Sequence, residues 1–192
     1  MDIQEQLEGT KVVLKKYHAT FELAQKLYDL TIENKEHLLR WMNWAVPLVS
    51  GRVEDEFAFL KICEEDWKNK SHFEFGIYEK ETGEIVGGIG LIKLSPSCDK
   101  KAEIGYWLVK KACKKGYMQE AVQLVEKFAF DLGYNRLVIR NEVSNAASRH
   151  VAERLGYVFE GVERQGHFCL AHKQFADINV FSKLRSEYEK GA

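Results

Sequence analysis

The sequence predicts a mixed α/β fold in which helices flank a central sheet. Three observations support this class. The first third of the 192 residues carries apolar side chains at helical spacing, the middle switches to strand-like segments joined by a glycine turn, and the remainder alternates strands with helices. No repeat, low-complexity tract or linker divides the chain, so we expect one domain over residues 1–192.

Helices dominate the first third after a short strand at residues 12–14. Thr20 is suited to cap a helix with one apolar face. A second helix is expected over residues 32–44 and should end at Pro47, and a third is expected over residues 53–68. The apolar stripe of this third helix is predicted to consist of Val53, Phe57 and Leu60. We expect these helices to pack together on one side of the fold.

The middle of the chain predicts strands. Residues 73–78 and 85–92 read as a hairpin whose turn ends at Gly83, where glycine permits a positive φ. A third strand is expected over residues 101–109. The second strand contains Gly87, Gly88 and Gly90. These glycines indicate a bulge or a close backbone approach.

The last third alternates helices and strands. A helix of about four turns is predicted from Tyr117 to a close at Gly133, followed by a strand at residues 136–140. Asn145 is a suitable N-cap for a helix over residues 145–155. Two further strands are expected over residues 157–163 and 177–184.

Composition excludes several classes of protein. A formal net charge of -1 gives no basic field of the kind that non-specific nucleic-acid binding requires. No apolar run approaches the roughly 20 residues of a membrane helix, and the acidic residues 1–8 do not resemble a secretion signal, so we expect a cytoplasmic protein. The cysteines, Cys63, Cys98, Cys113 and Cys169, are scattered without metal-ligand spacing. We therefore expect reduced thiols and no metal site.

The junction between the third strand and the long helix predicts an anion site. An apolar strand at residues 102–109 runs into a lysine-rich loop at residues 110–117 that contains Gly116 and opens the helix. Such a loop presents backbone N–H groups and the positive end of a helix dipole to an anion. A phosphate-bearing ligand is the first hypothesis.

Four motifs in this order resemble the GNAT superfamily of acyl-CoA N-acyltransferases, and most closely its Rim-type branch of ribosomal-protein N-terminal acetyltransferases. They are Ile-Gly-Tyr-Trp-Leu at 104–108, Lys-Gly-Tyr-Met at 115–118, Asn-Ala-Ala-Ser at 145–148 and Arg-Leu-Gly-Tyr at 154–157. The resemblance implies a mixed, mostly antiparallel sheet with one splayed parallel pair, and a homodimer. It also implies transfer of an acetyl group from acetyl-CoA to a primary amine.

In that family the cosubstrate lies where two parallel strands part, here the strand ending at Val109 and the strand at residues 136–140. The resemblance implies a cofactor site made of Trp107, Leu108, Val109, Lys114, Lys115, Gly116, Tyr117, Met118, Asn145 and Ser148. The loop departs from the family pattern of Gln/Arg-x-x-Gly-x-Gly/Ala, because Cys113 replaces the first residue and Met118 the last. The loop lysines are expected to offset the missing arginine by charge.

Three residues are candidates for proton transfer. Many relatives carry a tyrosine acid where this chain has Ala152, so Ser148 is the candidate acid for the departing sulfur. His167 and Glu103 are candidate bases for the amine, which must be neutral to attack. Asn141 and Glu142, at the end of the adjacent strand, are weaker candidates. Cys113 and Cys169 have no predicted histidine partner, so we expect direct transfer rather than an acyl-enzyme.

The acceptor groove is expected along residues 37–44, with Trp41 and Trp44 flanking a peptide terminus and Arg40 ordering its backbone, and along a loop at residues 165–175. The preferred acceptor is the N-terminal amine of a ribosomal protein. A polyamine or other small amine is the first alternative, and acidic residues 54–56 and 64–66 leave it open. A non-catalytic acyl-CoA-binding module is the second, suggested by Ala152, Cys113 and Met118.

Overall fold

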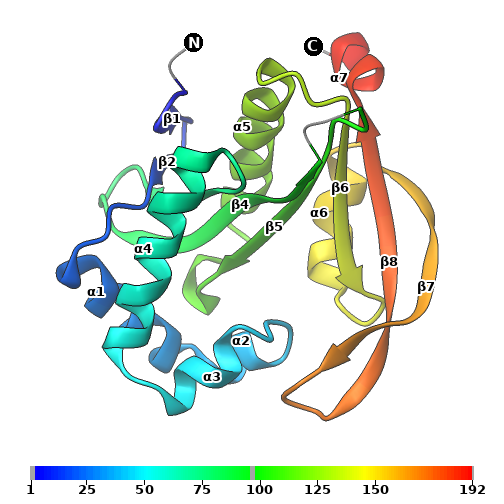
Figure 1. Cartoon of the computed structure of the whole chain (residues 1–192). Coiled ribbons are helices and arrows are strands. Elements are labelled where there is room, and N and C mark those ends of the chain that lie inside the picture. Colours follow the sequence, from blue (N-terminus) through cyan, green and yellow to red (C-terminus); the bar gives the residue numbers. More distant parts are fainter. Residues whose placement is uncertain (1–2, 96–97, 192) are drawn as a thin grey trace.

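A computed structural model describes residues 3–95 and 98–191 of the chain. These residues form an eight-stranded sheet in the order β1-β2-β3-β4-β5-β6-β8-β7, in which every neighbouring pair is antiparallel except β5 and β6 (Figure 1). The strands are β1 Gln6–Glu8, β2 Val12–Lys16, β3 Phe73–Glu79, β4 Ile85–Ser95, β5 Lys101–Leu108, β6 Arg136–Glu142, β7 Val158–Cys169 and β8 Gln174–Leu184. The predicted fold class is confirmed.

Helices lie on both faces of the sheet. They are α1 Phe21–Glu33, α2 Lys35–Leu39, α3 Ala45–Ser50, α4 Val53–Asn69, α5 Tyr117–Asp131, α6 Ala146–Arg154 and α7 Arg185–Gly191, with a short 3₁₀ turn η1 at Lys110–Ala112. The pair α1 and α4 covers one face of the β2–β5 half, and α5 and α6 cover the opposite face (Figure 1). No helix of the described chain is both long and apolar enough to cross a membrane.

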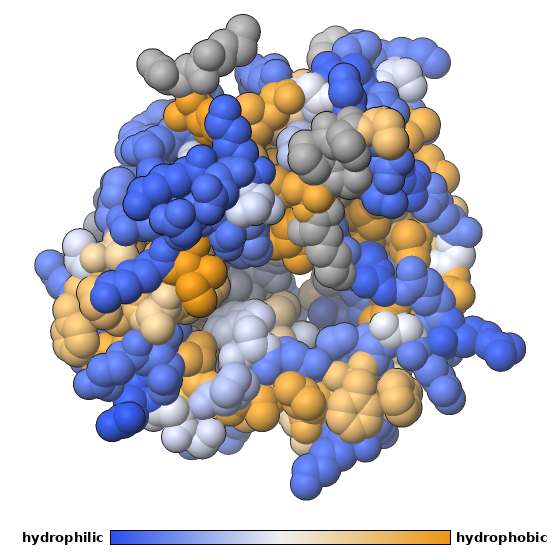
Figure 2. Space-filling view, in the orientation of Figure 1, coloured by the Kyte–Doolittle hydropathy of each residue, from blue (hydrophilic) through white to orange (hydrophobic). Residues whose placement is uncertain are grey.

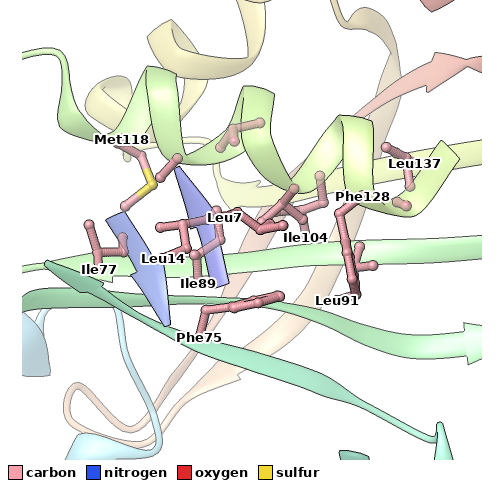
Figure 3. Packing of buried hydrophobic residues seen from close by; sticks show 14 of the residues in the cluster. Leu7, Leu14, Phe75, Ile77, Ile89, Leu91, Ile104, Met118, Phe128 and Leu137 are labelled. Carbon is pink, nitrogen blue, oxygen red and sulfur yellow. The ribbon is translucent and has the colours of Figure 1, made fainter. Parts of the chain in front are cut away.

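The main core lies between α5 and the sheet. Apolar residues of α5 recur at helical spacing, so one face of this helix is buried against β2, β4 and β5. Met118 and Phe128 point from α5 toward Leu14 and Phe75 on the strands (Figure 3). The core thereby fixes α5, and the loop before it, relative to β5.

The parallel pair β5 and β6 separates after three residues. Lys101, Ala102 and Glu103 pair with Arg136, Leu137 and Val138. Beyond them, residues 104–108 of β5 pair with β4, and residues 139–142 of β6 pair with β8. We call the space between these two stretches the wedge. Space-filling Figure 2 shows the surface hollowed near the centre of this view, above the positions of α2 and α3 in Figure 1.

Glycines allow β4 to approach β5 closely, as the sequence predicted. A Cβ atom at Gly87 would lie 2.2 Å from the Trp107 carbonyl oxygen, and one at Gly88 would lie 2.6 Å from Trp107 Nε1. The register between β3 and β4 also shifts between Ile77 and Tyr78, so a bulge is present as well. These glycines seat the Trp107 indole on the α1–α4 face.

Two expectations about the first helices were wrong. Pro47 does not end a helix but lies in the first turn of α3, where proline is tolerated because the N–H groups of that turn have no partner within the helix. The buried stripe of α4 is Glu56, Leu60, Cys63 and Trp67, whereas Val53 and Phe57 are only half-buried. The N-cap at Thr20 is confirmed, since its side chain accepts a hydrogen bond from the Leu23 N–H.

The C-terminal region is more regular than expected. Residues 165–175, predicted as a loop, belong mostly to the hairpin β7–β8, whose strands pair as far as Cys169 and Gln174. Nearly all of β7 is exposed, so its sequence lacks the apolar alternation of a half-buried strand. The edge strand β1 and the terminal helix α7 were not predicted either.

Candidate active site

The loop between β5 and α5 has the backbone form of an anion site. Lys114 and Gly116 adopt left-handed conformations, with φ of 64° and 83°, and Gly116 is the N-cap of α5. The first N–H groups of a helix have no partner within it, and the helix dipole favours a negative charge there. The Met118 side chain is buried in the core, so its bulk does not obstruct the loop (Figure 3).

A lysine from the N-terminal hairpin lies against this loop, and sequence reasoning missed it. Lys11 Nζ donates a hydrogen bond to the Lys115 carbonyl at 3.4 Å, and it lies 3.1 Å from the position that a Cβ of Gly116 would take. The loop lacks the arginine of its family pattern. Lys11 therefore brings an additional cation beside Gly116.

Glu120, in the first turn of α5, holds the turn that carries Lys11. Its carboxylate accepts hydrogen bonds from the backbone N–H groups of Thr10, Lys11 and Val12, each at 2.8 Å, and from the Thr10 hydroxyl. Burial alone would raise the pKa of Glu120, but these hydrogen bonds outweigh burial and lower it. The carboxylate is thus ionised and fixes the β1–β2 turn beside the loop.

The side chain of Lys115, one of the predicted loop lysines, is engaged with β3. Lys115 forms an ion pair with Glu79 at 3.2 Å, and the Tyr117 hydroxyl donates to the same carboxylate. Hydrogen bonds from Tyr117, Thr82 and Lys115 lower the pKa of Glu79 to about 2. Lys115 and Tyr117 are thereby drawn toward β3, so what they offer a phosphate directly is their backbone.

The free backbone groups of β5 differ from those expected. The Val109 N–H donates to the Val86 carbonyl at 2.9 Å, so Val109 is engaged with β4 and does not offer this N–H to a ligand. In an antiparallel pair, every second residue exchanges hydrogen bonds with its partner strand. The ladder therefore also engages Trp107 with β4, and it leaves the backbone groups of Tyr106 and Leu108 facing the wedge.

Ser148 lies on the α6 side of the wedge and contacts a residue of β5. The Asn145 side chain caps α6 by accepting from the Ser148 N–H at 3.1 Å, as predicted. Ser148 Oγ lies 2.9 Å from Tyr106 Oη. Burial raises the pKa of Tyr106 to about 12, against the opposing effect of the Ser148 hydrogen bond, so this phenol stays protonated at neutral pH.

The two candidate bases lie on the opposite face of the sheet from Ser148. Glu103 Oε2 is 3.9 Å from Arg140 Nη1, and Arg140 also forms an ion pair with Glu163. The strand register places His167 opposite Ala176, on the same face as Glu163. The structure thus joins Glu103 to Arg140 and separates both candidate bases from the candidate acid.

The end of β6 carries several buried polar atoms that lack partners. Arg140 Nε, Asn141 Nδ2 and Glu142 Oε1 have no hydrogen-bond partner among the described residues. All three residues lie beyond Val138, the last β6 residue paired with β5. Buried polar groups are normally satisfied, so these atoms make the end of β6 a candidate for contact with a ligand.

The segment between α2 and α3, where the acceptor groove was predicted, is joined to the β7–β8 hairpin. The Asn43 amide donates to the Phe168 carbonyl at 2.7 Å and accepts from the Leu170 N–H at 2.9 Å, which joins the segment to the β7–β8 hairpin. The Trp44 ring lies 5.4 Å from the Trp107 ring. Of the other predicted acceptor residues, the Arg40 guanidinium lies 4.8 Å from the Trp41 ring centre and is occupied there.

Cys113 has a histidine neighbour that was not expected. His37 Nε2 lies 3.9 Å from Cys113 Sγ, which also contacts the Val109 carbonyl. Burial raises the pKa of the Cys113 thiol, so it is not an activated thiolate. Within residues 3–95 and 98–191, no three His, Cys, Asp or Glu side chains are grouped to hold a metal ion.

Comparison with known proteins agrees with this geometry. The family model of the acetyltransferase (GNAT) domain matches residues 17–158. The chain is 31% identical to the Bacillus subtilis (strain 168) protein named "Putative ribosomal N-acetyltransferase YdaF", over 86% of this chain and 88% of that protein. It is 30% identical to the ribosomal-protein-serine acetyltransferase of Escherichia coli (strain K12), over 87% of this chain and 90% of that protein.

A solved structure that contains acetyl-CoA is also similar to this chain. The microcin C7 self-immunity acetyltransferase MccE, solved with acetyl-CoA and AMP, superposes with a TM-score of 0.82 at 25% identity, over 92% of this chain and 93% of that one. The chain belongs to the GNAT acetyltransferase family. It is an acetyl-CoA-dependent N-acetyltransferase of the Rim type.

Proposed function

We propose that this enzyme transfers the acetyl group of acetyl-CoA directly to the N-terminal amine of a ribosomal protein. The names of the two relatives at 30% and 31% identity supply the acceptor class. The parting of β5 and β6 after Glu103 and Val138 carries the proposal, because it opens the sheet beside an anion-binding loop. An acyl carrier and an extended peptide can then meet from opposite faces.

The cosubstrate is proposed to bind by backbone groups. The first N–H groups of α5 and the Lys11 ammonium receive the diphosphate. The outward-facing backbone groups of Tyr106 and the carbonyl oxygen of Leu108 pair with the pantetheine amides, which satisfies groups that the strands leave open. Acetyl-CoA supplies an activated acyl group, and the chain holds it in line with the amine.

Ser148 is proposed to protonate the sulfur as it leaves. Its hydroxyl is oriented by Tyr106 Oη at 2.9 Å, and the Asn145 cap fixes the first turn of α6 that carries it. Tyr106 is protonated at neutral pH, so it can pass its proton to Ser148 through this hydrogen bond and is then reprotonated from water. The pair replaces the tyrosine acid that the buried Ala152 cannot provide.

The amine is proposed to lose its proton on the other face of the sheet. An N-terminal amine has a pKa of about 8 and is largely protonated at neutral pH, so it needs an acceptor for its proton. Glu103 lies at the point where the strands part, and His167 lies on the same face in β7. The kcat/KM values of Glu103→Gln and His167→Gln separate the two, because only the variant that lacks the proton acceptor should lose activity by a large factor.

The acidic segments that left a polyamine acceptor open have structural roles instead. Asp55 accepts from the Arg52 N–H at 2.8 Å, Glu56 is buried, and Glu64 accepts from the Ala19 N–H at 3.0 Å. These three carboxylates are engaged within the fold and are not available to a polycation. Their placement supports the peptide acceptor over a polyamine.

A homodimer is also proposed. Strand β7 is an edge of the sheet and exposes Val158, Phe159 and Val162. Exposed apolar edge strands tend to be covered by a partner. Light scattering at micromolar concentration should give twice the monomer mass, and a monomer mass would contradict this proposal.

The deciding experiment is mass spectrometry of ribosomal proteins incubated with the enzyme and isotope-labelled acetyl-CoA. We expect the label on the α-amine of one protein, and no label with the Ser148→Ala variant at matched times. Label on lysine side chains only, or on free polyamines in a competing reaction, would contradict the proposed acceptor.

A further inference from the structure

Asn141 presents an unused hydrogen-bond donor in the wall of the wedge. It is 6% exposed, and its Nδ2 has no partner among the described residues. A neutral donor that is buried and unpaired destabilises the folded protein. Leucine has the same branched side-chain skeleton and no donor to leave unpaired, so packing alone does not explain an asparagine here.

The orientation of this donor is fixed from behind. Asn179 lies directly opposite Asn141 in the β6–β8 pairing and is also buried, at 4% exposed. Its Nδ2 donates to Asn141 Oδ1 at 3.1 Å. Because the oxygen end of the Asn141 amide is occupied, only the NH₂ end remains for a ligand.

The face on which Asn141 lies is the acyl side of the wedge. In the parallel register Ala102 pairs with Leu137, so by alternation Tyr106 on β5 and Asn141 on β6 lie on the same face. Tyr106 contacts Ser148 on that face. Arg140 and Glu142 fall on the opposite face, with Glu103.

We infer that Asn141 Nδ2 donates a hydrogen bond to the thioester carbonyl oxygen of the bound acyl-CoA, and that Asn179 is its positioning residue. The inference rests on the proposed function, which puts the thioester in the wedge. As the amine forms the C–N bond, the carbonyl electron pair moves onto oxygen, where Asn141 on one wall and the Leu108 N–H on the other stabilise it. When the carbonyl re-forms, the C–S bond breaks and the sulfur takes the Ser148 proton, which Tyr106 replaces. The amine proton leaves on the opposite face.

Asn141→Leu tests the catalytic role. The loss of one oxyanion donor lowers kcat by about 10²–10³-fold in other enzymes, and we expect a loss in this range. The Kd for free CoA, which has no thioester carbonyl, should stay within about twofold. An unchanged kcat, or a CoA Kd that rises as much as kcat falls, would overturn the inference. Asn135→Leu, on an exposed residue just before β6, is the matched control.

Asn179→Asp tests the positioning role while Asn141 stays in place. The introduced carboxylate offers acceptors only, so the Asn141 amide should rotate, donate to that carboxylate and turn its own carbonyl oxygen toward the thioester. We expect a kcat loss close to that of Asn141→Leu with little change in CoA Kd. Retention of wild-type kcat in a folded Asn179→Asp protein would remove Asn179 from the mechanism.

A binding measurement on the unmodified enzyme covers the case in which these variants do not fold. Calorimetry should show acetyl-CoA binding about two- to tenfold more tightly than S-ethyl-CoA, a thioether that lacks the carbonyl. Equal Kd values would overturn the inference. Failure of the proposed function looks different, because the unmodified enzyme would then transfer no acetyl group to any protein N-terminus.

Discussion

The hydroxyls of Tyr106 and Ser148 lie 2.9 Å apart and join β5 to the first turn of α6 across the wedge. Tyr106 is buried, and its pKa is raised to about 12, so it acts on Ser148 as a neutral hydrogen-bonding group. This contact gives the candidate acid a fixed geometry. It also makes the two residues a single functional unit whose effects should not add.

We therefore expect Ser148→Ala to lower kcat by about 10²-fold and Tyr106→Phe by roughly tenfold. The double variant should be no slower than Ser148→Ala alone, because Tyr106 works through Ser148. Steady-state kinetics of the four proteins, with CoA Kd from calorimetry, measures the cycle. Losses in kcat that multiply in the double variant, or CoA Kd values that rise as much as kcat falls, would show that Tyr106 and Ser148 do not act as one unit.

Lys11 should matter for phosphate binding although it lies far from the loop in sequence. Lys11→Met removes the cation beside Gly116 and should raise the Kd of CoA and of 3′-dephospho-CoA by the same factor, about three- to tenfold. Lys15→Met is the matched control, since the Lys15 ammonium lies over the Tyr78 ring instead. If only CoA binding weakens, Lys11 contacts the 3′-phosphate and the proposed diphosphate contact is wrong.

Glu120→Gln should reproduce part of this loss through the backbone. A glutamine replaces one acceptor oxygen by an NH₂ group, so either the Thr10 N–H or the N–H groups of Lys11 and Val12 lose their acceptor. We expect a lower Tm and a CoA Kd raised in the same direction as in Lys11→Met. An unchanged Tm with normal CoA binding would show that the β1–β2 turn holds its place without Glu120.

Local rules predicted the elements that depend on local contacts. The Thr20 and Asn145 caps each use a backbone N–H three residues away, and Gly116 is needed where φ is 83°. These features follow from side-chain and backbone chemistry within one turn. For the same reason, the sequence placed the loop with Gly116 correctly at the start of α5.

Contacts between distant segments could not be predicted in this way. Glu120 and Lys11 are 109 residues apart, and Asn43 and Phe168 are 125 apart, so no local pattern relates them. The Val109 N–H pairs with Val86 because of the register between β4 and the end of β5. A shift of that register by one residue would change which N–H groups face β4. In the same way, the motif at residues 145–148 identified Ser148 as the candidate acid, but no local pattern identified its hydrogen-bond partner Tyr106.

Asn43 should affect the acceptor and not the cosubstrate. Asn43→Ala removes both hydrogen bonds to the β7–β8 hairpin, so the acceptor side loses its closure. We expect the KM for an acceptor peptide to rise about fivefold or more, with CoA Kd unchanged. Asn69→Ala, on an exposed residue at the end of α4, should leave both values at wild type. A rise in CoA Kd for Asn43→Ala would assign the residue to the cosubstrate site instead.

Glu56 should make the enzyme less stable as the pH rises. Burial raises the pKa of this carboxyl from 4.5 to about 7, and one of its oxygens has no partner among the described residues. A carboxyl whose pKa is raised by folding stabilises the protein fully below pH 4.5, and that contribution is lost as the pH rises through about 7. Glu56→Gln should therefore raise the free energy of unfolding by on the order of 3 kcal/mol at pH 8.5 and change it little at pH 4.5.

Denaturant unfolding of the wild-type and Glu56→Gln proteins at the two pH values measures this difference. Glu54→Gln, on an exposed residue of the same helix, is the control. Equal stability changes at both pH values would mean that Glu56 does not titrate with folding.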